Sequence, residues 1–170
     1  MGLRSRSGFW MIVTLEVTET TPKGLPKTVR EQYVVEAASF IDAEERIRKE
    51  LNYSNRPIKN VAGIIRPKFG EICFNDDTAA ENWYKAKVVT TEEVEVRTRK
   101  GGTRTKTKSV SHFYLIQSDS NENARKAVDE VIYKGSNEDY EIADIQKTRI
   151  LDVLEFDKHL KSSKKEENEG

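Results

Sequence analysis

The sequence predicts an α+β fold built from an internal duplication, and two observations support this. First, residues 28–47 and 109–128 carry the same pattern at a shift of 81 residues, with tyrosine falling on tyrosine and serine on serine. Second, the match continues without a gap until Ile72 falls on Val153. A gapless match of this length predicts two copies of a β-β-α-β-β unit. We expect mostly antiparallel sheets, one helix per copy, and pseudo-twofold packing, because each copy alone has only a one-sided core.

The expected domain boundaries follow the two copies. Polar segments without an apolar pattern separate and flank them, and such segments do not bury enough surface to pack. We expect a flexible N-terminus at residues 1–8, a first repeat at 9–75, a connector at 76–82, a second repeat at 83–157 with a long basic hairpin at 90–109, and a disordered charged tail at 158–170.

In the first copy, strands are predicted at residues 9–18 and 28–37, where β-branched and aromatic residues gather on either side of a turn rich in proline and glycine. Ser39 is expected to cap a helix. The apolar residues of that helix recur at steps of three and four, which predicts a buried face made of Phe40, Ala43, Ile47 and Leu51. Strands at 58–66 and 71–74 close the copy.

The second copy repeats this plan. Its helix is expected to begin after Asp119 or Ser120 and to end at Gly135, because glycine favours the C-terminal end of a helix. The buried face of that helix is predicted to contain Ala124, Ala127 or Val128, and Val131. The expected strands are residues 83–89, 113–117, 142–147 and 150–156.

Composition excludes several classes of protein. The chain has 170 residues and a formal net charge of zero, so no global field attracts nucleic acid or a membrane surface. No apolar run approaches the length of a membrane span. Cys73 is the only cysteine, which excludes a disulfide within the chain and a multi-cysteine metal site. We therefore expect a cytoplasmic protein.

No motif points to an enzyme. The sequence lacks a glycine-rich phosphate loop, a nucleophile elbow and a paired-carboxylate motif. His112 and His159 have no second ligand at metal spacing, and Cys73 is expected to be a small core residue. Asp76 and Asp77 are expected to lie in a solvated loop. Catalysis is thus unsupported rather than excluded, and no catalytic residue, metal or cofactor is predicted.

The basic hairpin is the strongest candidate for a binding surface. If Gly101 and Gly102 form a two-residue turn, strand alternation places Arg97, Arg99, Arg104 and Lys106 on one face, with like charges paired across the ladder. Such pairing destabilises a hairpin unless a polyanion neutralises it. The alternative is a solvated arm whose charges protect an exposed edge from aggregation. The candidate nucleic-acid-binding residues are Arg97, Arg99, Lys100, Arg104, Lys106 and Lys108.

Trp10 and Trp83 occupy equivalent positions in the two copies. Exposed indole rings would form a platform on which bases stack. The apolar residues beside both tryptophans favour the alternative, in which each ring anchors its sheet under the helix as part of the core.

The chain also resembles a known family, and this resemblance lies in Trp10 and in residues 33–46, 64–74, 83–88 and 139–156. In these segments the chain resembles an uncharacterised family, a domain of unknown function carried by Bacteroides-type bacteria and their phages. The resemblance covers nearly the whole chain except its two ends. It implies a small cytosolic protein encoded by a phage or its host, and it brings no active site or ligand.

Two functions are predicted from different classes. The first is a non-enzymatic binding or regulatory module that acts in phage–host interaction, with a protein or a small ligand as partner. The alternative is a nucleic-acid-binding accessory protein that uses residues 97–108 on DNA or RNA. Steep salt dependence would distinguish the second from the first. No membrane partner is predicted, and exposed sheet edges would allow two chains to pair as a homodimer.

Overall fold

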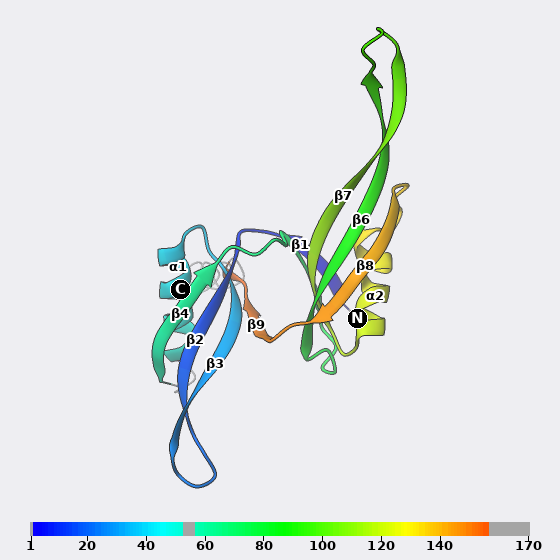
Figure 1. Ribbon diagram of the computed structural model, residues 1–170. Helices are drawn as coiled ribbons and strands as arrows, with labels where there is room; N and C mark the ends of the chain where they lie inside the picture. The colour runs from blue at the N-terminus through cyan, green and yellow to red at the C-terminus, as the bar shows by residue number, and fades with distance from the viewer. Residues whose placement is uncertain (1, 53–56, 157–170) are drawn as a thin grey trace, which may run out of the picture. The chain divides into compact units, whose positions relative to one another are not determined.

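The computed structural model describes residues 2–52 and 57–156, and it has the predicted mixture of strands and helices (Figure 1). The tail expected at 158–170 lies outside the described residues. In chain order the elements are β1 (Leu3–Ser7), β2 (Trp10–Thr20), β3 (Pro26–Glu36), α1 (Phe40–Asn52), β4 (Ile58–Ile65), β5 (Glu71–Asn75), β6 (Asn82–Arg97), β7 (Thr103–Ser118), α2 (Asn121–Ala127), the π-helical turn η1 (Val128–Ile132), β8 (Asp139–Lys147) and β9 (Ile150–Leu154).

These elements form two compact units, each with its own sheet. Unit 1 contains residues 2–7 and 69–148, and its five strands are ordered β1-β5-β7-β6-β8. Unit 2 contains the described residues of 8–68 and 149–156, and its four strands are ordered β4-β2-β3-β9. Both sheets are mixed, because β5 runs parallel to β7 and β9 runs parallel to β3.

Each unit buries one face of its sheet under its helix. In unit 1, Ala124, Ala127 and Val128 pack with strand residues that include Ala86 and Ile116. In unit 2, α1 supplies the predicted Ala43, Ile47 and Leu51. All of these side chains are buried, which is the result that apolar periodicity predicted. Among the described residues, no helix has the length and apolar character needed to cross a membrane.

The helix N-termini follow their sequence signals, with one correction. The backbone N–H of Asp42 donates to the Ser39 hydroxyl at 3.1 Å, and that of Asn123 donates to the Ser120 hydroxyl at 3.1 Å. Ser120, and not Asp119, is therefore the cap of α2. Phe40, expected on the buried face, is 49% exposed because it is the first residue of α1 and precedes the first turn that packs on the sheet.

The strands that close the two sheets come from the opposite half of the chain. β5 follows β4 of unit 2 but pairs with β7 of unit 1, and β9 follows β8 of unit 1 but pairs with β3 of unit 2. If either half of the chain kept its own last strand, the chain would have to cross from one sheet edge to the other between two parallel strands. Such a crossover takes about a dozen residues or more. Only residues 66–70 and 148–149 are available, so the strands exchange.

The N-terminus also differs from the expectation of a flexible segment. Leu3–Ser7 forms β1, an antiparallel edge strand on β5. The Ser5 hydroxyl donates a hydrogen bond to the Glu71 carboxylate, and the Arg4 guanidinium lies over the Phe74 ring, 4.2 Å from its centroid. β1 therefore covers the edge that β5 would otherwise leave open.

Candidate functional site

The long hairpin extends beyond the sheet of unit 1 as a two-stranded ribbon. β8 pairs with β6 only as far as Thr91, which is opposite Asp139. From Glu92 to Lys108, β6 and β7 pair with each other and with no third strand of the described chain (Figure 1). We call residues 92–108 the ribbon. Both of its edges are therefore available to a partner.

The turn at the tip of the ribbon is longer than the predicted two-residue turn. Residues 98–102 form it. The N–H of Thr98 donates to the carbonyl of Gly102 at 2.8 Å, and the N–H of Gly101 donates to the carbonyl of Thr98 at 3.1 Å. Gly101 has a φ of 82°, a conformation that side chains with a Cβ rarely adopt. Of the two glycines, only Gly101 has this left-handed conformation, so the predicted Gly101–Gly102 two-residue turn is wrong.

This turn sets a register that differs from the predicted one. Arg97 lies opposite Thr103, and Val96 lies opposite Arg104. Arg97 therefore does not share a face with Arg104 and Lys106, and the expected ladder of like charges is wrong. The repulsion that this ladder would have caused is absent, because threonines and valines occupy the opposing positions.

The ribbon instead has two chemically different faces. The first, which we call the cationic face, carries Arg104, Lys106 and Lys108 from β7, opposite Val96, Val94 and Glu92 from β6. The second, which we call the threonine face, carries Thr103, Thr105 and Thr107 opposite Arg97, Glu95 and Glu93. Arg99 and Lys100 lie in the turn between the strands. All six basic candidates are exposed, and the structure brings three of them together on one face.

Trp10 and Trp83 are buried, with 4% and 2% of their surface exposed. Neither ring therefore offers a face for a base to stack on. Strand alternation places both on the side of the sheet opposite the helix, because Met11 and Tyr84 point into the helix-covered cores. The Trp83 ring meets Phe74 edge to face, with centroids 5.8 Å apart. The two tryptophans are buried, as expected of core anchors. However, they lie on the face of each sheet opposite the helix and not under the helix.

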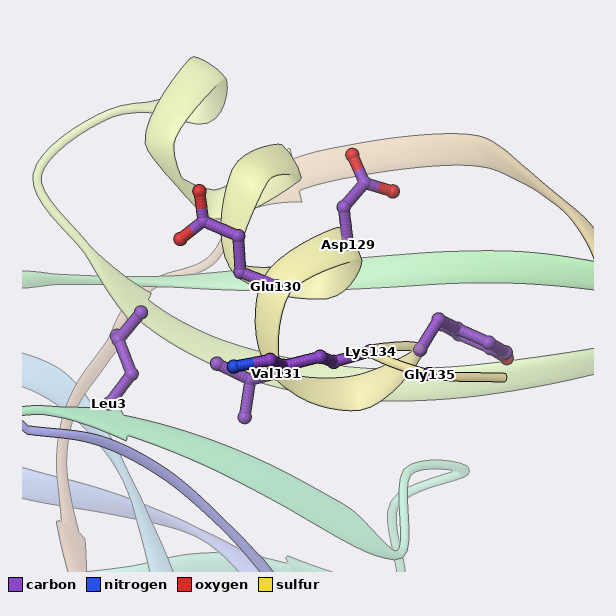
Figure 2. Close-up of a pocket in the computed structure, with 7 residues that line it drawn as sticks. Leu3, Asp129, Glu130, Val131, Lys134 and Gly135 are labelled. Atoms are coloured by element: carbon purple, nitrogen blue, oxygen red, sulfur yellow. The ribbon is translucent and has the colours of Figure 1, made fainter. Parts of the chain in front are cut away.

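A second candidate is a hollow beside the π-helical turn of unit 1, with a volume of about 560 Å³. Figure 2 shows the carboxylates of Asp129 and Glu130 pointing apart, so they do not converge on one point as a cation would require. Its lining residues are Leu3, Asp129, Glu130, Val131, Tyr133, Lys134 and Gly135. No pattern in the sequence indicated this hollow.

Comparison with known proteins identifies a family. The model of a domain of unknown function, DUF4494, matches residues 9–156. The chain belongs to the DUF4494 family. No curated protein and no solved structure matches it. The family assignment agrees with the resemblance to an uncharacterised family, and it carries no activity with it.

In this DUF4494 chain, three tyrosines join the π-helical turn to the sheet. The hydroxyls of Tyr114 and Tyr133 lie 3.0 Å apart in a buried position. The Tyr133 ring stacks on Tyr140 at a centroid distance of 4.1 Å, and the Tyr140 hydroxyl donates to Asp129 at 2.6 Å. Burial raises the pKa of Tyr114 and that of Tyr133, while the bond to Asp129 is the main cause that raises the pKa of Tyr140. The three phenols therefore stay protonated at neutral pH.

The tyrosine pair makes a testable contribution to stability. We expect Tyr133→Phe to lower the free energy of unfolding by about 1–3 kcal/mol, because the Tyr114 hydroxyl remains buried without this partner. The double variant Tyr114→Phe/Tyr133→Phe should be at least as stable as either single variant, since both partners are then apolar. Urea unfolding of the three variants measures this. A double variant less stable than both singles would contradict a pairwise bond.

Three other residues that were considered in the sequence have the burial or the contacts of structural positions. Cys73 is fully buried, as expected, and burial is the main cause that raises its pKa to about 11. The His112 ring nitrogen Nε2 lies 2.9 Å from the Thr90 hydroxyl. Asp77 accepts the N–H of Ala79 at 3.0 Å and so shapes the connector. Within residues 2–52 and 57–156, no group of three histidine, cysteine, aspartate or glutamate side chains is arranged to hold a metal ion.

Proposed function

We propose that this DUF4494 chain is a non-enzymatic binding module whose ribbon contacts a nucleic acid. The observation that carries the proposal is the ribbon itself. It projects from the sheet with six basic residues and no acidic residue between 97 and 108, in a chain with no net charge. A local basic patch on a neutral chain supports a polyanionic partner, because the whole molecule supplies no such attraction.

The shape of the ribbon supports the same partner. Two-stranded ribbons enter nucleic-acid grooves and carry arginine and lysine to phosphates. The solvated-arm alternative explains exposure and charge. It does not explain why three cations gather on one face of β7 while the carboxylates Glu93 and Glu95 gather on the other.

The two sheets also support the proposal of an internal duplication. Tyr33 pairs with Asp152 in one sheet and Tyr114 pairs with Glu71 in the other, which is the same pairing at a shift of 81 residues. The β2–β4 and β6–β8 registers break after Thr14 and after Lys87, which are equivalent at the shift of 73 residues that relates Trp10 to Trp83. We propose that the second copy of an ancestral unit acquired the ribbon as its binding arm.

Origin in a Bacteroides-type bacterium or its phage, and a role in phage–host interaction, belong to the proposal as well. They rest on the sequence resemblance alone. A module that binds nucleic acid without catalysis is compatible with that role, because it would act by occupying a site.

Fluorescence anisotropy with labelled DNA and RNA, at low and moderate salt, tests the function. We expect binding that weakens steeply with salt. A variant with serine at the six basic positions should bind more weakly, and its salt slope should be smaller by about one unit for each phosphate that the variant no longer reaches. If the chain does not bind DNA or RNA at low salt, the proposal of a nucleic-acid partner is wrong. Capture of protein partners would then test whether the chain is a binding module for a protein.

A further inference from the structure

We propose that the nucleic acid is B-form duplex DNA, and that the ribbon lies in its major groove with the cationic face on the phosphates of one strand. This inference rests on the proposed function and specifies its ligand. Three features of the ribbon carry it: its size, the separation of charge between its faces, and the absence of aromatic rings.

The size of the ribbon fits the groove. Six residue pairs, from Glu92–Lys108 to Arg97–Thr103, precede the turn. At about 3.4 Å per residue they extend roughly 20 Å from the last residues that pair with β8. The major groove of B-form DNA is about 8.5 Å deep and admits a two-stranded ribbon. Laid along the groove, a ribbon of this length runs beside several successive phosphates of one strand.

The separation of charge gives the ribbon one orientation in the groove. Arg104, Lys106 and Lys108 alternate along β7, so their side chains leave the same face about 7 Å apart. The residues across the ladder from Arg104 and Lys106 are valines, so no carboxylate directly opposes the two outer cations. A phosphate can therefore approach both without a competing acid.

The threonine face has the opposite character. Glu93 and Glu95 lie on it, opposite Thr107 and Thr105, and would repel a phosphate placed there. The ribbon is thus able to present only one face to a line of phosphates. Arg97 lies on the threonine face and is expected to contribute less than Arg104.

The absence of aromatic residues disfavours a single strand. Residues 92–108 contain no phenylalanine, tyrosine or tryptophan. Proteins that hold single strands stack bases on exposed aromatic rings, and Trp10 and Trp83 are buried.

An RNA duplex is disfavoured for a different reason. Its major groove is deep and narrow, and side chains do not reach into it.

The test compares three probes of equal length and sequence: a DNA duplex, the single DNA strand and an RNA duplex. Anisotropy is measured with the full chain between about 50 and 200 mM salt. We expect the DNA duplex to bind at least about tenfold more tightly than either other probe. Equal or tighter binding of the single strand or the RNA duplex would overturn this inference and leave the proposed function standing.

Two matched variants test the orientation on the DNA duplex. The first carries Arg104→Thr, Lys106→Thr and Lys108→Thr on the cationic face. The second carries Lys85→Thr, Lys87→Thr and Lys147→Thr, which are exposed strand positions outside the ribbon. Both variants lose three positive charges.

Only the first variant is expected to lower the salt slope, by about three units, because it removes three cations that bind phosphates. Equal losses of affinity in both variants would mean that net charge alone drives binding, and would overturn the proposed orientation. If no probe binds the wild-type chain at about 50 mM salt, this inference and the proposed function both fall.

Discussion

Ile47→Ala should lower the free energy of unfolding by about 2–5 kcal/mol, the cost expected for deleting most of a buried aliphatic side chain. Ile47 is fully buried and sits in the middle of the packed face of α1. Its neighbours in the core of unit 2 include Val13, Val35 and Leu51. These side chains come from three different elements, so they are unable to collapse into the space without moving the helix away from the sheet.

Ile41→Ala is the matched control, because Ile41 lies on the same helix and is 72% exposed. We expect its effect to stay within about 0.5 kcal/mol. Urea unfolding followed by far-ultraviolet circular dichroism compares the two variants with the wild type. If both variants had the same reduced stability, the face of α1 that carries Ile47 would not be the one that packs on the sheet.

The helices show how much of the fold could be predicted from local signals. Three local signals predicted α1 and α2: a serine cap, apolar residues three and four apart, and polar residues at the other positions. The packed faces of both helices are those expected. The failure at Phe40 has a local cause. Periodicity places a residue on a helix face, but it does not report where along its length the helix begins to contact the sheet.

The exchange of closing strands was not predicted, although the sequence contained the relevant signal. The internal match suggested that each copy completes its own sheet. The segments before β5 and β9 are residues 66–70 and 148–149, which are too short to join parallel strands on opposite edges of one sheet. Loop length considered together with strand direction would have excluded self-contained copies.

The ribbon shows the limit of predicting a turn from glycines alone. The six basic residues were found, but the turn spans residues 98–102, which moves the pairing by three residues. Because side chains alternate between the two faces of a strand, a shift by an odd number of residues changes which residues of β6 and β7 share a face. The first hairpin contains a comparable loop, because the N–H of Thr21 donates to the carbonyl of Leu25 at 2.8 Å and Gly24 has a φ of 79°.

The tyrosine cluster could not be predicted from the sequence. Tyr114 lies on β7, Tyr133 follows the π-helical turn and Tyr140 lies on β8. No single period of a strand or a helix connects three such elements. Their contact depends on the wider π-helical turn that sets the position of Tyr133, and no residue pattern in the helix indicated that turn.

Val153→Asp should destabilise unit 2 by at least about 3 kcal/mol, because it places a charged carboxylate in a buried position. Val153 is 8% exposed and pairs with Val34, which is fully buried in the interior strand β3. Although β9 is encoded in the second half of the chain, the loss of stability should appear in a sheet that is otherwise built from the first half. Amide hydrogen exchange at Val34 and Val35 measures this loss directly.

Leu151→Asp separates the effect of burial from the effect of the carboxylate, since Leu151 lies on the same strand and is 50% exposed. Its expected cost is about 0.5 kcal/mol or less, with normal protection of Val34. Equal and small effects from both substitutions would mean that β9 is not packed on β3 in solution. Strong destabilisation by Val153→Asp alone would support the exchange, because the five- and two-residue connections leave β9 no route to the sheet of its own half.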